Sequence, residues 1–297
     1  MNMSKLKTRL LSTYRQMRRW VDHMTGTNFP FNRVDRDALQ QTIEHNRKTL
    51  GRIPSWIQDK QLESSVFNYG LTPQARRLID LPLANCCTHA DLLVYFAQRL
   101  NKPVRYLELG VSVGKTFWQV LHASEKIELV GFDIEELNPA LAASLLLESK
   151  EQWPTMHSSL KKTDSSFSIY RNQRSECRVH YLCGDIFDPN SWARLDGRKF
   201  NLLLSDAFHS VDAIEWEWQQ LLQRRLLDPE ECVIMWDDLD GEMHQWFLAK
   251  RSAIMQAMDI GASNIGTLWI YGWLGRREYL HRIGLAFRGG VLERGLR

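Results

Sequence analysis

The pattern of hydrophobic and polar residues changes near residue 104. Up to about Asn101 the apolar positions follow a helical spacing with no strand-like run, so we interpret residues 1–87 as a helical extension. Thr88 and Asp91 have the spacing of a capping box and predict a helix from Thr88 to about Leu100. From Val104 onward, short apolar runs alternate with segments of helical length, which is typical of βαβ units in a parallel sheet.

Seven apolar runs are predicted strands, and most are separated by a predicted helix. The strands are expected at 104–109, 127–132, 179–182, 200–204, 232–236, 265–271 and 283–288, and the helices between them at 115–123, 139–150, 190–195, 211–227 and 242–258. The last two strands are too close for a helical crossover, so they should form an antiparallel hairpin at the sheet edge. The expected fold is an α/β, Rossmann-like, doubly wound sheet of seven strands, mostly parallel, within a domain at 88–297.

One polar segment interrupts this regular alternation. Residues 151–178 are rich in Ser, Lys and Thr and are longer than an ordinary link between a helix and a strand. Long loops in compact domains usually serve a function or are disordered. We therefore interpret this insertion as a lid or substrate loop.

Composition limits the class of protein. The 297 residues are 44% hydrophobic and 25% charged, which suits one large α/β domain with an appendage. No apolar run approaches the roughly 18 residues of a membrane span, so we expect a soluble protein. The five cysteines are odd in number and lack CxxC spacing, which disfavours a disulfide framework or a zinc site and favours a reducing, cytoplasmic location.

Charge is distributed unevenly along the chain. The net charge is +3, but residues 1–21 carry +6 and residues 276–297 carry +4, which leaves −7 for the remainder. An acidic body disfavours nucleic acid as a partner. The basic first segment also resembles an organelle presequence or a membrane-surface helix, although we interpret it as a solvated helix. The helical extension also offers a surface for a homodimer.

The turn after the first predicted strand has the features of a cofactor loop. It runs from Glu108 to Gly114, where Gly110 permits a tight turn and Gly114 allows close approach of the next helix. Ser112 occupies the middle position, where the dinucleotide fingerprint has glycine. The turn alone therefore fits several cofactors.

Residues at the ends of the next two predicted strands narrow the choice of cofactor. Asp133 and Ile134 follow the second strand, and an acid there can accept hydrogen bonds from the hydroxyls of a ribose. Asp185 and Ile186 follow the third strand, where the acid can receive an adenine amino group and Ile186 can cover the ring. Asp133 and Asp185 also have ordinary structural interpretations as acids that begin a helix or a turn.

Taken together, these residues resemble the class I S-adenosylmethionine-dependent methyltransferases over roughly residues 88–288. The resemblance implies that Glu108, Gly110, Ser112 and Gly114 surround the methionine part of the cofactor. It also implies that Asp133 binds the ribose and that Asp185 with Ile186 contacts adenine. An NAD-binding Rossmann domain is the competing interpretation, and the terminal hairpin favours the methyltransferase.

Acidic residues follow the fourth and fifth predicted strands. Asp206 and His209 come after the fourth, and Asp237 and Asp238 after the fifth. Three carboxylates without a nearby cysteine form an oxygen-rich set that suits Mg²⁺ or Ca²⁺ better than zinc. Each carboxylate can instead cap a neighbouring helix, and His209 can be an ordinary surface residue.

These residues look like those of the metal-dependent small-molecule O-methyltransferases, including the macrocin and mycinamicin sugar enzymes. The resemblance implies that Asp206, Asp237 and Asp238 hold a divalent cation, that Asp206 also borders the cofactor, and that His209 is the base. The expected reaction is O-methylation of a small hydroxylated natural product or sugar. Open alternatives are a metal-independent N- or C-methyltransferase and a cofactor-binding scaffold without turnover. Several of the eleven tryptophans, including Trp216 and Trp236, belong either to an acceptor pocket or to the core.

Overall fold

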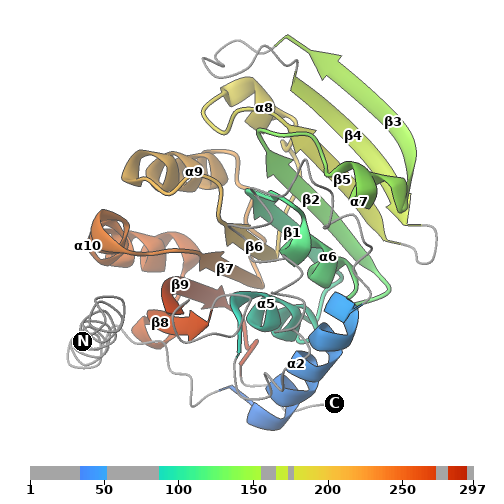
Figure 1. Ribbon diagram of the computed structural model, residues 1–297. Coiled ribbons are helices and arrows are strands. Elements are labelled where there is room, and N and C mark those ends of the chain that lie inside the picture. The colour runs from blue at the N-terminus through green and yellow to red at the C-terminus, as the bar shows by residue number, and fades with distance from the viewer. Residues whose placement is uncertain (1–33, 52–86, 155–164, 173–176, 272–279, 293–297) are drawn as a thin grey trace, which may run out of the picture.

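The computed structural model describes residues 34–51, 87–154, 165–172, 177–271 and 280–292. In these residues, a mixed sheet of nine strands lies between two layers of helices (Figure 1). The strands are β1 (Val104–Leu109), β2 (Ile127–Asp133), β3 (Leu145–Trp153), β4 (Ser165–Asn172), β5 (Arg178–Cys183), β6 (Leu202–Ser205), β7 (Cys232–Trp236), β8 (Ile265–Tyr271) and β9 (Leu280–Arg288). The helices are α2 (Arg36–Gly51), α5 (His89–Ala97), α6 (Lys115–Leu121), α7 (Pro139–Ala143), α8 (Pro189–Ala193), α9 (Val211–Gln223), α10 (Gly241–Met258) and the 3-10 helix η4 (Ala262–Asn264).

The strand order is β3-β4-β5-β2-β1-β6-β7-β9-β8. The five central strands, β5 to β7 in this order, are parallel. At one edge β9 pairs antiparallel with both β7 and β8. The last strand of the chain, β9, is therefore internal to the sheet, and β8 is the edge strand. The predicted α/β sheet with a C-terminal antiparallel hairpin is therefore confirmed, and all seven predicted strands belong to it. The predicted count of seven is wrong, because the sheet has nine strands.

The opposite edge of the sheet differs from the prediction. The helix expected at 139–150 is wrong beyond Ala143, because Leu145–Trp153 forms β3 and pairs antiparallel with β4. β3 is an edge strand whose residues 146–152 are all exposed, so it has no buried stripe that would distinguish a strand from a helix. β4 lies within the segment interpreted as a loop. Its serines at 165, 166 and 168 are buried, and residues 155–164 and 173–176 lie outside the described residues.

Two hydrophobic clusters fill the two faces of the sheet. Tyr106 packs with α5 and α6 on one face, while the next residue, Leu107, packs with α8, α9 and α10 on the other. Successive side chains of a strand point to opposite faces, so apolar residues at both positions bury both faces. The helices are arranged accordingly on the two sides of the sheet (Figure 1). None of the helices in the described ranges has the length and hydrophobicity that a membrane-spanning helix needs.

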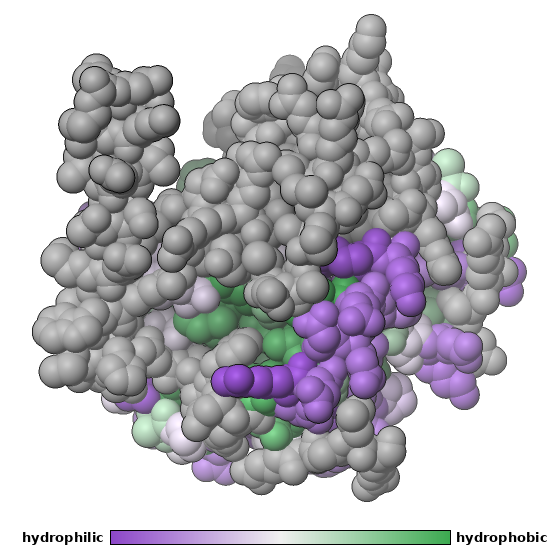
Figure 2. All heavy atoms as spheres, turned by 60° about the horizontal axis from the view of Figure 1, so that its bottom comes forward, coloured by the Kyte–Doolittle hydropathy of each residue, from purple (hydrophilic) through white to green (hydrophobic). Residues whose placement is uncertain are grey.

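The described part of the helical extension is α2, which packs on α5. Thr88 caps α5 in the predicted capping box with Asp91. Asp35 precedes α2, and its backbone N–H donates to the Tyr95 hydroxyl of α5 at 3.0 Å. On the side of the molecule that carries α2, hydrophobic residues lie in a hollow beside a band of hydrophilic residues (Figure 2). The basic segment 1–21 lies outside the described residues, as do residues 276–279 and 293–297 of the second basic segment.

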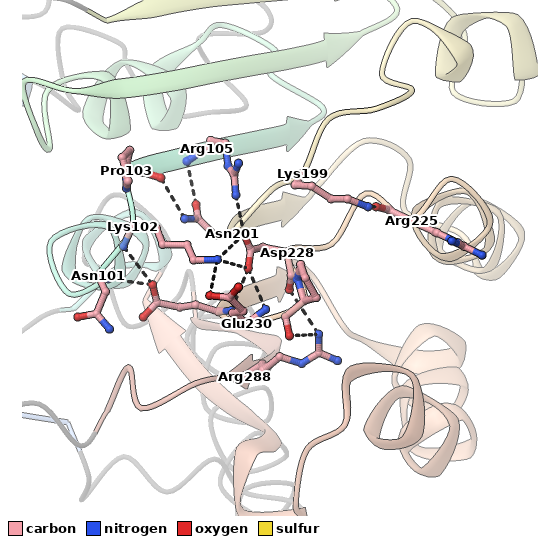
Figure 3. Close-up of polar contacts among 12 residues, drawn as sticks. Asn101, Lys102, Pro103, Arg105, Lys199, Asn201, Arg225, Asp228, Glu230 and Arg288 are labelled. Atoms are coloured by element: carbon pink, nitrogen blue, oxygen red, sulfur yellow. Dashed lines mark hydrogen bonds and ion pairs between the residues drawn. The ribbon is translucent and has the colours of Figure 1, made fainter.

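A cluster of ion pairs around Asp228 holds the amino ends of the central strands together (Figure 3). Asp228 lies between α9 and β7 and accepts hydrogen bonds from Lys102 at 3.2 Å and from Arg105 of β1. Arg288 of β9 donates to the carbonyl oxygens of Asp228 and Pro229. This cluster lies at the amino end of β1, and the predicted site lies at the carboxyl end, so the two can be altered separately.

Candidate functional site

The predicted site residues lie in turns that follow neighbouring strands, at the carboxyl edge of the sheet. The first backbone N–H of each turn donates a hydrogen bond to a carbonyl oxygen at the end of a strand beside it in the sheet. These hydrogen bonds fix the distances between the turns. The backbone N–H of Gly110 donates to the carbonyl oxygen of Phe132, that of Asp206 to Leu109 and that of Gly184 to Asp133, each at 2.8 Å. The N–H of Asp237 donates to the carbonyl oxygen of Ser205 at 3.0 Å. Ligands of open α/β sheets bind at this edge.

The turn after β1 is held against the turns that follow β2 and β6. Gly110 has φ +84°, and a Cβ there would lie 2.2 Å from the Asp206 carbonyl oxygen, so only glycine fits. Ser112 also has a positive φ, of 51°, at the position where the fingerprint has glycine. Its backbone N–H donates to the Asp133 carboxylate at 2.7 Å. This hydrogen bond joins the methionine and ribose positions of the expected cofactor.

Asp133 is buried but keeps hydrogen-bonding capacity. It is 8% exposed, and its two carboxylate oxygens accept hydrogen bonds from the backbone N–H groups of Ser112 and Glu135. Burial raises the pKa of Asp133 above its ordinary value, while these backbone hydrogen bonds oppose the rise. Each carboxylate oxygen has two lone pairs, so acceptor sites remain for ribose hydroxyls. Ile134 beside it is half-exposed, as a side chain in contact with a ligand can be.

The turn after β5 is shaped by two tryptophans. The Asp185 carboxylate accepts the Phe187 N–H at 2.8 Å and thereby stabilises the turn. The Ile186 carbonyl oxygen accepts the indole N–H groups of Trp192 and Trp216, both at 2.6 Å. Sequence reasoning did not identify these bonds, because a backbone carbonyl has no sequence signal and the donors come from α8 and α9. Two donors on one oxygen fix the position of the residue expected to cover adenine.

Glu108 and Lys115 flank the first turn, and both side chains are buried. Glu108 is 2% exposed and accepts the Tyr106 hydroxyl at 2.7 Å. Burial raises the pKa of Glu108 to about 8, and the Asp133 charge adds to the rise, whereas Tyr106 and Lys115 oppose it. Burial likewise lowers the pKa of Lys115 to about 7. Lys115 was not among the predicted site residues.

Asp206, His209 and Asp238 lie close together. One ring nitrogen of His209 lies 3.6 Å from Asp206, and the other lies 3.7 Å from Asp238. Burial raises the pKa of Asp206 well above its ordinary value, and the charges of Asp237, Asp238 and Glu108 add to the rise. Histidine is the side chain that most often acts as a general base, so His209 held between these carboxylates can remove a proton from a bound group.

A buried acid, Glu217, lies near Asp206. Glu217 of α9 is 2% exposed and accepts the Ser205 hydroxyl at 2.5 Å. Burial raises the pKa of Glu217 to about 7, and the Ser205 hydrogen bond opposes the rise. Glu217 lies between two tryptophans in an amphipathic helix, so its sequence context did not distinguish it from a surface acid. Its charge contributes to the raised pKa of Asp206.

The metal interpretation has less support. Asp206, Asp237 and Asp238 are close enough to perturb one another electrostatically. Within the described ranges, however, no group of three or more His, Cys, Asp or Glu side chains is arranged to hold a metal ion. The residues as placed do not fit a divalent cation, and the ligand roles of these three aspartates stay a prediction.

Trp236, one of the candidate pocket residues, belongs to the core. It is 1% exposed, and its ring packs edge-on against Trp218 and Phe247. Trp216 contacts the site through its indole N–H instead. Trp273 lies outside the described residues.

Comparison with protein-family models finds no match, and comparison with curated proteins finds none either. Among solved structures, the chain is similar to the O-methyltransferase TomG of Streptomyces achromogenes in complex with S-adenosylmethionine (18% identity, 75% of this chain and 88% of that chain, TM-score 0.44). It is also similar to the N-methyltransferase NodS of Bradyrhizobium japonicum in complex with S-adenosylhomocysteine (11% identity, 76% and 98%, TM-score 0.41). A third similar structure is the plantazolicin methyltransferase BpumL (14% identity, 84% and 99%, TM-score 0.40).

Proposed function

We propose that this chain is an S-adenosylmethionine-dependent methyltransferase that transfers a methyl group to a hydroxyl oxygen of a small molecule. The observation that carries this proposal is the meeting of three turns at one edge of the sheet. Gly110 contacts the backbone of Asp206, while the neighbouring Ser112 bonds to Asp133. The candidate ribose ligand Asp133 and the turn that carries Asp206 are thus both held by the backbone of the cofactor loop.

The strand order supports this cofactor over NAD. An NAD-binding doubly wound sheet has six parallel strands in the order 3-2-1-4-5-6. Here β9 runs antiparallel and lies between β7 and β8. Ser112 also replaces the glycine that the dinucleotide fingerprint places against the pyrophosphate. The antiparallel β9 and the serine at position 112 both disfavour binding of a dinucleotide, and both are compatible with a cofactor that has no pyrophosphate.

The His209 and Asp206 pair favours oxygen as the methyl acceptor. A hydroxyl is a weak nucleophile until its proton is removed, whereas a neutral amine can attack carbon without a base and release its proton afterwards. Asp206 and Asp238 lie 3.6 and 3.7 Å from the two ring nitrogens of His209, so carboxylates flank and can orient the candidate base. When bound, S-adenosylmethionine supplies a methyl carbon on a sulfonium, and the electron pair of the broken carbon–sulfur bond stays on sulfur. The protein then mainly needs to align the reacting atoms.

The proposed reaction does not require a metal ion, because the proton has an acceptor in the protein. The sequence-based alternative assigns Asp206, Asp237 and Asp238 to Mg²⁺. Chelation separates the two: we expect turnover to survive EDTA, whereas loss with EDTA and recovery with Mg²⁺ would support the metal-assisted version.

The activity itself is tested by transfer of a labelled methyl group from S-adenosylmethionine to a panel of small hydroxylated compounds, with matched amines. We expect label in the hydroxyl compounds and its loss in His209→Ala. Label in amines only, with no dependence on His209, would favour an N-methyltransferase. Cofactor binding without transfer to any compound would favour the scaffold alternative.

A further inference from the structure

Lys115 is a buried cation that the proposed reaction does not use. It is the first residue of α6, directly after the cofactor loop, and is 6% exposed. Its ammonium interacts electrostatically with Asp91 of α5, Arg47 of α2, Asp237 after β7 and Glu108 of β1. Lys115 thus lies where the candidate cofactor loop meets the N-terminal extension.

The charge of Asp91 is already matched by groups other than Lys115. Asp91 is fully buried, and its two carboxylate oxygens accept hydrogen bonds from the two terminal nitrogens of Arg47, at 3.1 and 3.0 Å. Asn46 donates to one oxygen at 2.9 Å, and the backbone N–H and hydroxyl of Thr88 donate to the other. Such a bidentate pair is a strong, geometrically defined interaction. A carboxylate with five donors does not need Lys115 as its counterion.

The charges around the first turn complement an amino acid. The methionine part of S-adenosylmethionine carries an ammonium and a carboxylate at one end, beside the sulfonium. The site offers the acids Glu108, Asp206 and Asp237, and Lys115 is the buried cation beside them. The acids can match the ammonium and the sulfonium, which leaves the carboxylate to be matched by a cation.

We propose that Lys115 binds the carboxylate of the methionine part, and that Arg47 of α2 positions it by keeping Asp91 neutralised. This inference rests on the proposed cofactor. Without Arg47, Asp91 would be a buried carboxylate without a matching cation, and it would draw the Lys115 ammonium away from the cofactor. The described part of the N-terminal extension thereby contributes to cofactor recognition without touching the cofactor.

The test uses two ligands that differ in one group. S-adenosyl-3-thiopropylamine is S-adenosylhomocysteine without its carboxylate. By calorimetry, Lys115→Met should weaken binding of S-adenosylhomocysteine about 10- to 100-fold, the range for a hydrogen bond to a charged group, and leave the decarboxylated ligand nearly unchanged. Equal losses for both ligands, or no loss for either, would overturn the proposal.

The wild-type protein provides a test that needs no variant. It should bind S-adenosylhomocysteine more tightly than the decarboxylated ligand, and equal affinities would contradict carboxylate recognition even if Lys115→Met failed to fold. If neither ligand binds the wild-type protein, the proposed function itself fails. Lys102→Met is the matched control: Lys102 pairs with Asp228 and Glu230 at the other end of the sheet, so this change should alter neither affinity.

The positioning role of Arg47 has its own control. Arg47→Met should reduce the preference for the carboxylate-bearing ligand, as Lys115→Met does. Arg99 also links α5 to the start of α2, through Asp35 at 3.5 Å, but it does not pair with Asp91. Arg99→Met should lower Tm and leave the preference unchanged. If both arginine variants lower Tm and neither changes the preference, Arg47 has only a structural role.

Discussion

The backbone carbonyl oxygen of Asp206 lies against Gly110, where a Cβ would approach it to 2.2 Å. The cofactor loop and the turn that carries Asp206 are therefore packed backbone to backbone, with no side chain between them. This contact explains why Gly110 cannot be replaced even by alanine without moving one of the two turns.

Gly110→Ala should abolish detectable cofactor binding and activity, because both the clash and the φ of +84° oppose alanine. Gly197 provides a matched control, since its φ is +79° and nothing lies within 4 Å of a Cβ there. Gly197→Ala should cost only about 1–2 kcal/mol of stability from backbone strain and retain activity. Equal effects of the two variants on cofactor binding would show that the contact with Asp206 is unimportant.

Asp206 and Asp228 should affect stability in opposite directions. Burial and neighbouring carboxylates raise the pKa of Asp206, so its ionisation destabilises the folded state once pH exceeds the ordinary carboxylate range. At pH 7, Asp206→Asn should therefore raise Tm, and it should lower kcat about 100-fold or more because the candidate base His209 loses a neighbouring carboxylate. A lower Tm would contradict the electrostatic account of this site.

Asp228 provides the comparison. Hydrogen bonds from backbone N–H groups and from Lys102 lower the pKa of Asp228 against the effect of burial, so its ionised form stabilises the folded state. Asp228→Asn should lose about 1–3 kcal/mol at pH 7 with little change in kcat. The difference from wild type should shrink as pH falls below about 4, where the carboxylate takes up its proton. A difference that persists at pH 3 would point to packing instead of charge.

Cofactor affinity should depend on pH with a maximum between the pKa values of Lys115 and Glu108, which are about 7 and about 8. Binding should favour ionised Glu108, so affinity rises with pH up to the pKa of Glu108. It should also favour protonated Lys115, so this contribution to affinity falls as pH rises above the pKa of Lys115. Glu108→Gln should remove the rising limb and Lys115→Met the falling limb, measured by calorimetry with S-adenosylhomocysteine from pH 6 to 9. A flat profile in the wild-type protein would contradict these roles.

Trp216→Phe should raise the KM for the cofactor about 5- to 10-fold, because it removes one indole donor from the Ile186 carbonyl, a loss of about 1 kcal/mol. Trp246 offers a control with a similar bond outside the site: its indole N–H donates to Glu215 at 2.6 Å. Trp246→Phe should lower Tm and leave the KM unchanged. An unchanged KM in Trp216→Phe would mean that Trp192 alone holds the turn.

The central part of the fold could be predicted because its strands are buried on both faces. β1, β2 and β7 are near-continuous apolar runs, which a parallel sheet covered by helices requires. β3 and β4 were missed for the opposite reason. The residues of β3 are mostly exposed, and β4 buries serines, so neither shows the apolar alternation that indicates a strand.

The site residues also divide into those whose position the sequence indicates and those whose position it does not. Asp133, Asp206 and His209 were predictable because they follow recognisable strands, and the edge of a parallel sheet brings strand ends together. The contact of Arg47 with Asp91 joins residues 44 positions apart through helix packing, which no local pattern encodes. The role of the Ile186 carbonyl was also hidden, because it depends on where the indoles of Trp192 and Trp216 point.

Calorimetric titration of the wild-type protein and of Asp133→Asn with S-adenosylhomocysteine and with NAD tests the central claim most directly. Asp188→Asn is the control, because Asp188 is also a buried carboxylate but caps α8. We predict that one S-adenosylhomocysteine binds per chain, that NAD does not bind, and that Asp133→Asn weakens binding at least about 10-fold while Asp188→Asn does not. Binding of NAD instead, or equal affinity of S-adenosylhomocysteine for the wild-type protein and Asp133→Asn, would contradict the proposed cofactor site.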